Sequence, residues 1–268
     1  KGSHPDVLVM TATPIPRTLS MSYFADLDVS IIDELPPGRA PVVTKLIADN
    51  RRDEIIVRIQ HACQQGKQVY WVCPLIEESD TLQLQTAMET YENLCRIFPD
   101  LRAGLVHGRL STQEKTAVMT SFKLGKIQLL VATTVIEVGV DVPNASLMVI
   151  ENAERMGLSQ LHQLRGRVGR GSEASICILL YQKPLSEIAR KRLKIIFEHT
   201  DGFEIARQDL QLRGPGEFLG ARQSGVPMLR FADLEQDGEL LAAAQTTANE
   251  MLNDYPELVQ WHTQRWLG

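Results

Sequence analysis

The sequence predicts an α/β fold in which a parallel sheet, covered by helices on both faces, is followed by a helical hairpin and a helical tail. Two observations lead to this prediction. Between residues 41 and 184, short apolar segments alternate with amphipathic ones, as strands alternate with helices in a parallel sheet. After residue 185 the alternation stops and only helical patterns remain.

The expected strands are short apolar runs without regular polar alternation, which is typical of strands that are buried on both faces. Strands are expected at residues 6–11, 42–48, 69–73, 102–106, 127–132, 146–151 and 174–181. Because ligands of parallel sheets bind at the carboxyl ends of the strands, the residues that follow each run are candidates for function.

Helices are expected at residues 17–24, 51–65, 81–97, 111–124, 158–164, 185–199, 203–210 and 235–252. Asn50 is expected to cap the second of these, with Asp53 in its first turn. Ser111 and Glu114 have the spacing of a capping box. Residues 35–41 contain three prolines and one glycine, which marks a linker. We therefore expect three parts, at residues 1–40, 41–184 and 185–268, with a functional loop at 211–226 in the last.

Composition excludes several classes of protein. The chain has 268 residues, of which 44% are hydrophobic and 23% charged, as in ordinary globular proteins. It has no run of about 20 apolar residues, so no membrane partner is expected. Four cysteines without a Cys-x-x-Cys pair argue against a zinc site and favour reduced thiols in a cytoplasmic protein. Residues 1–4 are either native or a cloning remnant.

The net charge of −5 argues at first against a polyanionic partner, but its distribution is uneven. Residues 235–268 contain six acidic residues and one arginine, so the rest of the chain is neutral. Within that rest, residues 160–171 hold three arginines and no acid, and residues 190–194 form a second basic run. Phosphate binding depends on such local charge rather than on net charge.

Residues 163–171 read Gln-Leu-Arg-Gly-Arg-Val-Gly-Arg-Gly and follow a predicted helix. Arg167 and Arg170 each come after a glycine, which lets the backbone turn tightly. Guanidinium groups in this arrangement suit triphosphate oxygens and stabilise the charge that develops in phosphoryl transfer. The alternative is a basic turn at the surface.

Residues 132–141 follow another predicted buried strand. Thr133 and Thr134 supply hydroxyl and amide groups that suit a phosphate backbone, and Asp141, after Gly139, suits ribose hydroxyls. A threonine-capped helix with a structural aspartate is the alternative. The threonines at residues 11 and 13 occupy a similar place after the first expected strand, where a helix cap explains them equally well.

In order and in strand context, these segments resemble the superfamily 2 helicases and translocases. Residues 11–14 are similar to motif III, 132–143 to motif V and 160–171 to motif VI, and His107 with Gly108 lies in a segment similar to the one between motifs IV and V. Residues 33–39, 209–217 and 223–225 narrow the resemblance to the RecG family of bacterial DNA helicases, which reverse replication forks.

The resemblance implies that residues 41–184 form the second RecA-like lobe and residues 1–40 the end of the first lobe with the interlobe linker. It implies ATP and Mg²⁺ as ligands, both bound mainly by the first lobe. The implied partners are branched double-stranded DNA, such as forks and Holliday junctions, and, as a further candidate, single-stranded DNA-binding protein. The implied site residues are Gln163, Arg167 and Arg170 for catalysis; Gly139, Asp141, Arg167 and Arg170 for nucleotide; and His107, Gly108, Thr133 and Thr134 for DNA.

The sequence departs from these enzymes in one respect. It contains neither the Gly-rich loop that ends in Lys-Ser/Thr nor the acidic metal-binding motif. We therefore expect a C-terminal part of such an enzyme, unable to hydrolyse ATP by itself. Two alternatives remain: a transcription-repair coupling factor, which usually reads Arg-Gly-Ala-Gly-Asn where residues 213–217 read Arg-Gly-Pro-Gly-Glu, and a non-catalytic scaffold of the same fold.

Arg192 falls on the apolar stripe of the first hairpin helix, together with Leu185 and Ile188. A buried guanidinium needs partners, so we expect Arg192 and Arg213 to bond to each other's helix ends and to the loop at Gln223. The resemblance implies that these three residues couple nucleotide state to movement on DNA. An arginine whose head stays in solvent is the alternative.

Overall fold

The computed structural model describes residues 41–74, 80–133, 141–171, 173–213 and 238–267, together with residues 8, 10, 30 and 32. The strand expected at 6–11, the helix at 17–24, most of the linker and most of the loop at 211–226 lie outside the described residues. The predicted division of the chain at residues 40 and 184 stays a prediction.

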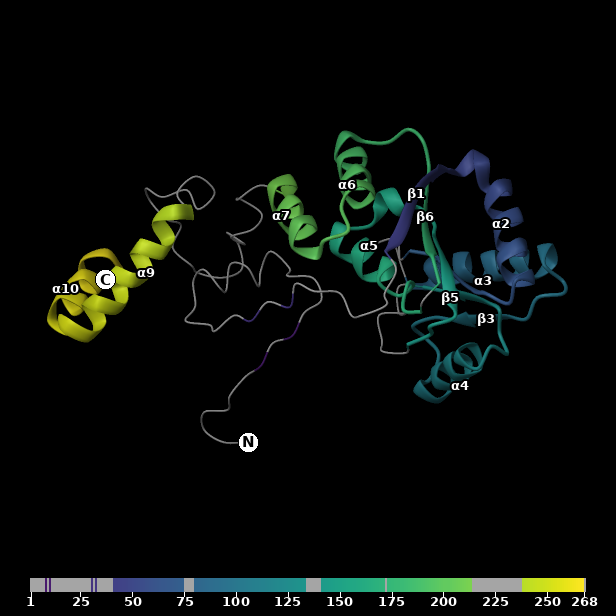
Figure 1. Ribbon diagram of the computed structural model, residues 1–268, viewed down its shortest axis with the longest axis horizontal. Helices are drawn as coiled ribbons and strands as arrows, with labels where there is room; N and C mark the ends of the chain where they lie inside the picture. The colour runs from purple at the N-terminus through teal and green to yellow at the C-terminus, as the bar shows by residue number, and fades with distance from the viewer. Residues whose placement is uncertain are drawn as a thin grey trace.

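The centre of the fold is a six-stranded sheet with the order β1-β6-β5-β2-β4-β3 (Figure 1). All five strand pairings are parallel, which confirms the predicted sheet type. The strands are β1 (Val42–Ala48), β2 (Gln68–Val72), β3 (Ala103–Val106), β4 (Leu129–Ala132), β5 (Ala145–Ile150) and β6 (Ser175–Tyr181).

Helices cover both faces of the sheet, because alternate residues of each central strand point to opposite sides. Val69 and Trp71 of β2 pack in one core with α2 (Arg52–Gln64) and α3 (Asp80–Ile97). Tyr70 and Val72 pack in the other with α4 (Thr112–Lys123) and α5 (Leu158–Arg165). In Figure 1, α2 and α5 accordingly lie on opposite sides of the sheet.

Two helix starts test the predicted caps. At α4 the capping box is present: the Glu114 amide donates to Ser111 Oγ at 3.3 Å, and the Ser111 amide donates to Glu114 Oε2 at 2.8 Å. The predicted Asn50 cap is wrong. Asn50 lies inside a 3-10 turn, η1 (Asp49–Arg51), that precedes α2. Asp49 holds this turn by accepting from Arg52 at 3.0 Å, so the chain enters α2 without a capping side chain.

The predicted hairpin consists of α6 (Glu187–Glu198) and α7 (Gly202–Arg213). Ser186 caps α6 by accepting from the Ala189 amide at 3.2 Å, and Asp201 accepts from the Phe203 amide at 3.1 Å where α7 begins. Helix α7 extends past the expected end at residue 210. Leu193, Ile196 and Ile205 join the same core as α4 and α5, so the hairpin packs on that face of the sheet domain.

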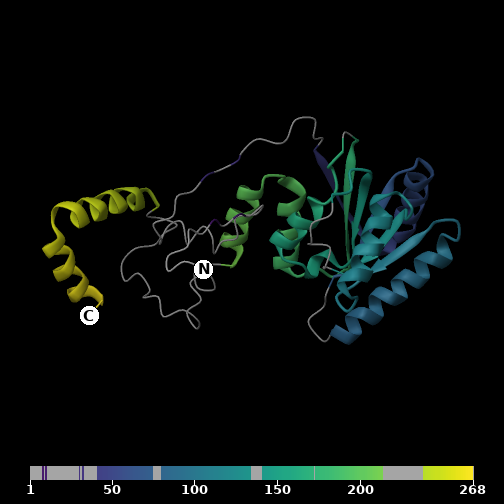
Figure 2. The same cartoon turned by 90° about the horizontal axis from the view of Figure 1, so that it is seen from below.

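The tail differs from the prediction of one helix. It contains two, α9 (Gly238–Asp254) and α10 (Pro256–Leu267), which contact each other (Figure 2). The break falls at Tyr255, because the residue before a proline disfavours the helical conformation. Within the part of the chain that the structure describes, no helix is both long and apolar enough to cross a bilayer.

Candidate nucleotide and nucleic-acid site

The predicted site residues that follow β3 and β4 lie side by side at the carboxyl edge of the sheet. Val106 pairs with Ala132 at the ends of these strands, and the Thr133 amide donates to the Val106 carbonyl at 3.1 Å. His107 and Thr133 are therefore the first residues beyond two neighbouring strands. The structure brings these two predicted DNA contacts together, whereas Thr134 and Gly139 lie outside the described residues.

Both residues hold buried polar atoms without a hydrogen-bond partner: Thr133 Oγ1 and His107 Nδ1. Native proteins leave few such atoms unsatisfied, so this pair suits an external ligand. The local charge suits an anion, because Lys115 Nζ donates to the Gly108 carbonyl at 2.9 Å. Burial, followed by the charges of Lys115 and Arg109, lowers the pKa of His107, so its ring is neutral near pH 7.

The segments at 141–143 and 166–171 meet at a second place. Helix α5 ends at Gly166, and Gly169 adopts a left-handed φ of 74° that bends the chain back. Arg170 Nε donates to the Gly166 carbonyl at 3.1 Å, and its NH1 lies 3.4 Å from Asp141 Oδ1. Two residues predicted to bind nucleotide, Asp141 and Arg170, are thus in contact, although they lie 29 positions apart in the sequence.

Close packing holds these two segments together. A Cβ atom on Gly171 would lie 2.6 Å from the Pro143 carbonyl oxygen, so the backbone approaches closer than any side chain permits. Val142 and Val168 are fully buried in the same core. Burial raises the pKa of Tyr70 to about 12, and the charges of Arg167 and Arg170 act on this phenol in the opposite direction. Asp141, Arg167 and Arg170 therefore all lie close enough to the Tyr70 side chain for their charges to act on it.

Of the remaining predicted site residues, some are described by the structure and others are not. Gln163 lies half-buried on α5, on the same helix that leads into Arg167. Gln223 and the side chain of Arg213 lie outside the described residues. Among the described residues, no group of three His, Cys, Asp or Glu side chains is placed to hold a metal ion. A role for Mg²⁺ therefore rests on the resemblance.

Polar side chains that follow β2 and β5 bond within a cluster of their own. Glu151, which follows β5, is buried and pairs with Arg52 at 2.5 Å. Its second oxygen accepts from Cys73 Sγ at 3.6 Å, and Arg52 lies over the Trp71 ring at 5.4 Å. Burial raises the pKa of Cys73, so this thiol stays protonated. Both Glu151 oxygens thus have a partner within the cluster, whereas the buried Trp71 Nε1 has no hydrogen-bond partner.

Arg165 has a role that the sequence motif does not indicate. The motif places it in a phosphate-binding run, but Arg165 is only 4% exposed. The guanidinium donates to the carbonyls of Ile196 at 2.7 Å, His199 at 2.8 Å and Thr200 at 3.2 Å, where α6 ends. A helical stripe in the sequence could have indicated this, because Arg165 lies four and seven positions after the buried Leu161 and Leu158.

His162 is a further partner of Arg165, with Nδ1 at 3.1 Å from the guanidinium. Burial, followed by the charge of Arg165, lowers the pKa of His162 to about 4. The ring is therefore neutral near pH 7 and accepts the hydrogen bond.

We expect this shift to make the chain less stable in weak acid. The pKa of His162 is about 4 in the folded chain and 6.5 in the unfolded one. Between these pH values the unfolded chain binds a proton at this histidine and the folded chain does not, so the free energy of unfolding falls as the pH falls. From pH 7 to pH 5 the loss is about 1 to 2 kcal/mol. Urea unfolding of the wild type and of His162→Asn at both values measures it. Asparagine can accept from Arg165 without titrating, so an equal loss in both proteins contradicts the assignment.

Arg192 is bound differently from the prediction. Its NH1 donates to the Met156 carbonyl at 2.9 Å and its NH2 to the Glu154 carbonyl at 3.0 Å, at the 3-10 turn η3 (Ala153–Arg155) that precedes α5. The expected bond across the hairpin is replaced because this side of α6 packs on the sheet domain. The predicted stripe was wrong for Ile188, which is 59% exposed, and the solvated arginine is not found.

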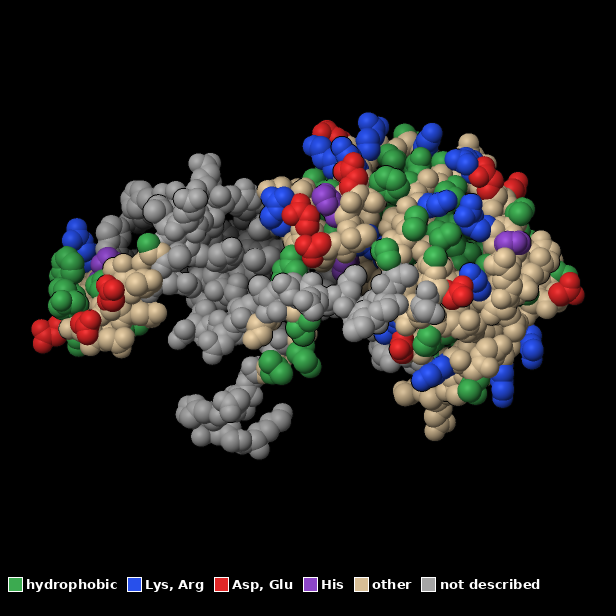
Figure 3. Space-filling model, in the orientation of Figure 1, with side chains coloured by type: hydrophobic (Ala, Val, Ile, Leu, Met, Phe, Trp, Pro, Cys, Tyr) green, Lys and Arg blue, Asp and Glu red, His purple; other side chains and the backbone are tan. Residues whose placement is uncertain are grey.

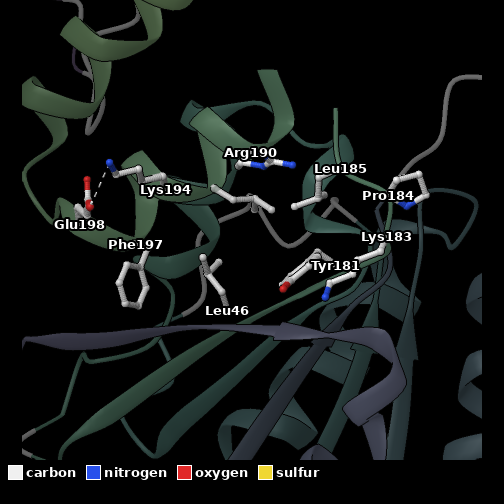
Figure 4. Close-up of a pocket in the computed structure, with 10 residues that line it drawn as sticks. Leu46, Tyr181, Lys183, Pro184, Leu185, Arg190, Lys194, Phe197 and Glu198 are labelled. Carbon is white, nitrogen blue, oxygen red and sulfur yellow. Dashed lines mark ion pairs between the residues drawn. The ribbon is translucent and has the colours of Figure 1, made fainter. Parts of the chain in front are cut away.

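Figure 3 shows Lys and Arg side chains mixed with Asp and Glu side chains over the region of α6. Lys191 pairs with Glu187 at 2.8 Å and Lys194 with Glu198 at 3.8 Å, which offsets much of their charge. A cavity of about 900 Å³ lies between this helix and the strands β1 and β6, with Leu46, Tyr181 and Phe197 in its lining (Figure 4). None of the predicted site residues lines it.

Comparisons with known proteins agree with this arrangement. Residues 51–172 match the family described as helicase conserved C-terminal domain, and residues 199–264 match ATP-dependent DNA helicase RecG, domain 3, C-terminal. The whole chain is 58% identical to ATP-dependent DNA helicase RecG of Acidithiobacillus ferridurans and 57% identical to that of Escherichia coli strain K12. It spans 39% of the length of each of these relatives.

A solved structure, RecG bound to a three-way DNA junction, is 46% identical to the chain. It superposes with a TM-score of 0.67 and covers 86% of this chain, which covers 30% of that one. These matches confirm the fold of the second RecA-like helicase lobe followed by helices. The chain belongs to the RecG family of ATP-dependent DNA helicases, of which it contains the helicase C-terminal domain and the C-terminal part of domain 3.

Proposed function

We propose that this chain supplies the second lobe and the coupling hairpin of an ATP-dependent translocase on double-stranded DNA, which reverses stalled forks and migrates branched DNA in recombination and repair. The observation that carries the proposal is the contact of Arg170 with Asp141, in segments that Gly171 and Pro143 hold together. Relatives that bear the RecG name, and one such relative solved with a three-way junction, support it.

At the nucleotide, Arg167 and Arg170 would contact the triphosphate and stabilise the charge that develops as the terminal phosphoryl group leaves. Asp141 would accept from ribose hydroxyls, and it also holds Arg170 in place until the nucleotide binds. Gln163 would orient the reacting groups from α5. Mg²⁺, held mainly by the first lobe, would neutralise phosphate charge when bound.

At the DNA, the unsatisfied Thr133 Oγ1 would donate to a backbone phosphate. Thr134, the neutral ring of His107 and the Gly108 backbone complete the proposed contact. Branched DNA is the proposed substrate, and single-stranded DNA-binding protein is a further candidate partner that rests on the family resemblance. A cytoplasmic location is part of the proposal, supported by four cysteines that form no disulfide.

The RecG reading is favoured over a transcription-repair coupling factor by one observation. Residues 199–264, which contain most of α7, α9 and α10, match RecG domain 3. The two arginines at 167 and 170, both in place, favour a working motor over a non-catalytic scaffold.

The proposal predicts a sharp difference between two proteins. The intact protein, meaning one of the relatives' length that contains this chain, is expected to hydrolyse ATP when branched DNA is added. The 268-residue chain is expected to show no turnover, because its sequence contains no Gly-rich loop ending in Lys-Ser/Thr. A phosphate-release assay with and without a synthetic fork measures both. DNA-stimulated turnover by the chain, or none by the intact protein, contradicts the proposal.

A further inference from the structure

Arg165 joins two parts of the molecule that the chain keeps far apart. Its backbone ends α5, and its carbonyl accepts from the Val168 amide at 3.3 Å within the turn that leads to Arg170. Its side chain extends away from this turn and reaches the end of α6, some 31 to 35 positions later. A single residue thus contacts both the nucleotide-facing turn and the loop between the two hairpin helices.

Backbone carbonyls, and no carboxylate among the contacts described, hold the positive charge of the Arg165 guanidinium. The last carbonyls of a helix have no partner within the helix and form the negative end of its dipole. Arg165 donates to the Ile196 carbonyl in that last turn and to the His199 carbonyl just beyond it. The neutral ring of His162 and the Thr44 hydroxyl, at 3.4 Å, complete its surroundings. The two terminal NH2 groups of the guanidinium, fixed in one plane, reach all of these acceptors at once.

The turn itself is linked rigidly to Arg165. The Gly166 amide donates to the His162 carbonyl at 3.0 Å, and the Arg167 amide donates to the Leu164 carbonyl at 2.9 Å. Arg170 then donates to the Gly166 carbonyl at 3.1 Å. Through these bonds a movement of the turn would be passed to the end of α5, and with it to the guanidinium of Arg165.

At its other side, α6 is fixed to η3 through Arg192. Two guanidinium groups therefore attach the hairpin to the sheet domain. Arg192 of α6 bonds to η3, which precedes α5, and Arg165 at the end of α5 bonds to the end of α6. We propose that Arg165 is a positioning residue that couples the nucleotide-facing turn to the loop between α6 and α7, so that nucleotide-driven movement reaches the hairpin. The inference rests on the proposed function.

The test uses the intact protein with Arg165→Gln and Arg165→Lys. The measurements are kcat and KM for DNA-stimulated ATP hydrolysis, and the number of base pairs unwound per ATP on a fork. We expect Arg165→Gln to keep kcat and KM within about threefold and to lower the unwinding per ATP about tenfold. Arg165→Lys, which retains the charge but fewer donors, should recover part of the loss. Arg207→Gln, exposed on α7 and paired only with Glu204 among the contacts described, is the matched control.

A purely structural role would lower hydrolysis and unwinding in proportion to the folded fraction, and that result, like unchanged unwinding, overturns the proposal. Hydrogen exchange tests the link directly in each variant. Peptides covering residues 195–206 should exchange faster in Arg165→Gln while those of β5 stay protected, and equal protection overturns the proposal too. If Arg165→Gln does not fold, Arg165→Lys decides by the same measurements. A wild type without DNA-stimulated hydrolysis would refute the proposed function, whereas the exchange result addresses Arg165 separately.

Discussion

Replacing Arg167 by lysine in the intact protein is expected to lower kcat for ATP hydrolysis about a thousandfold. Arg167 lies in the turn between α5 and Gly169, one residue beyond the helix cap, and its neighbour Arg170 is already engaged by Asp141. A lysine keeps the positive charge but loses the planar fork that binds two phosphate oxygens at once. The loss should therefore appear in the chemical step, with nucleotide binding changed much less.

Single-turnover hydrolysis with saturating nucleotide and fork DNA measures this effect. Arg207→Lys, on the exposed face of α7, is the control and should keep the wild-type rate. An Arg167→Lys protein that hydrolyses ATP within a few fold of the wild type would show that this guanidinium does not contact the reacting phosphates.

Replacing Arg192 by alanine should separate hydrolysis from unwinding. The guanidinium makes two charged hydrogen bonds to carbonyls at η3, and its loss leaves both acceptors half-buried without that partner. The hairpin would then follow the sheet domain poorly, while the groups around Arg167 remain in place. We expect fork unwinding to fall about tenfold to a hundredfold, with DNA-stimulated ATP hydrolysis largely retained.

The measurement compares hydrolysis and unwinding on the same fork. Lys191→Ala is the matched control, because Lys191 is the preceding residue of α6 but points outward to an ion pair with Glu187. Equal unwinding by Arg192→Ala and the wild type would exclude a coupling role for this residue. Parallel loss of hydrolysis and unwinding would indicate that α6 supports the nucleotide site as a whole.

The sheet and the hairpin were predictable because their patterns are local. All six described strands occur where apolar runs predict them, and their ends differ from the expected ones by at most two residues. The period of two places Tyr70 and Trp71 in opposite cores, and both are buried as expected. The motif order predicts Asp141 and Arg170 at one nucleotide site, and the structure places the two side chains in contact.

The features that were missed depend on partners that no sequence pattern specifies. Arg165 and Arg192 bond to backbone carbonyls, which every residue has, so only the packed positions of α6 and η3 select them. Asn50 has the right chemistry for a cap, but Arg52 draws Asp49 into a turn that starts the helix later. The second tail helix was hidden by Pro256, which suits the first turn of a helix as well as it ends one.

The contact between Gly171 and Pro143 restricts how this lobe can respond to a ligand. At this point residues 141–143 and 166–171 leave no room for a side chain between them, and the Arg170–Asp141 ion pair and the buried Val142 and Val168 join them as well. We therefore expect the two segments to move together as one unit, so that a change in their distance from a bound nucleotide comes from movement of the whole unit.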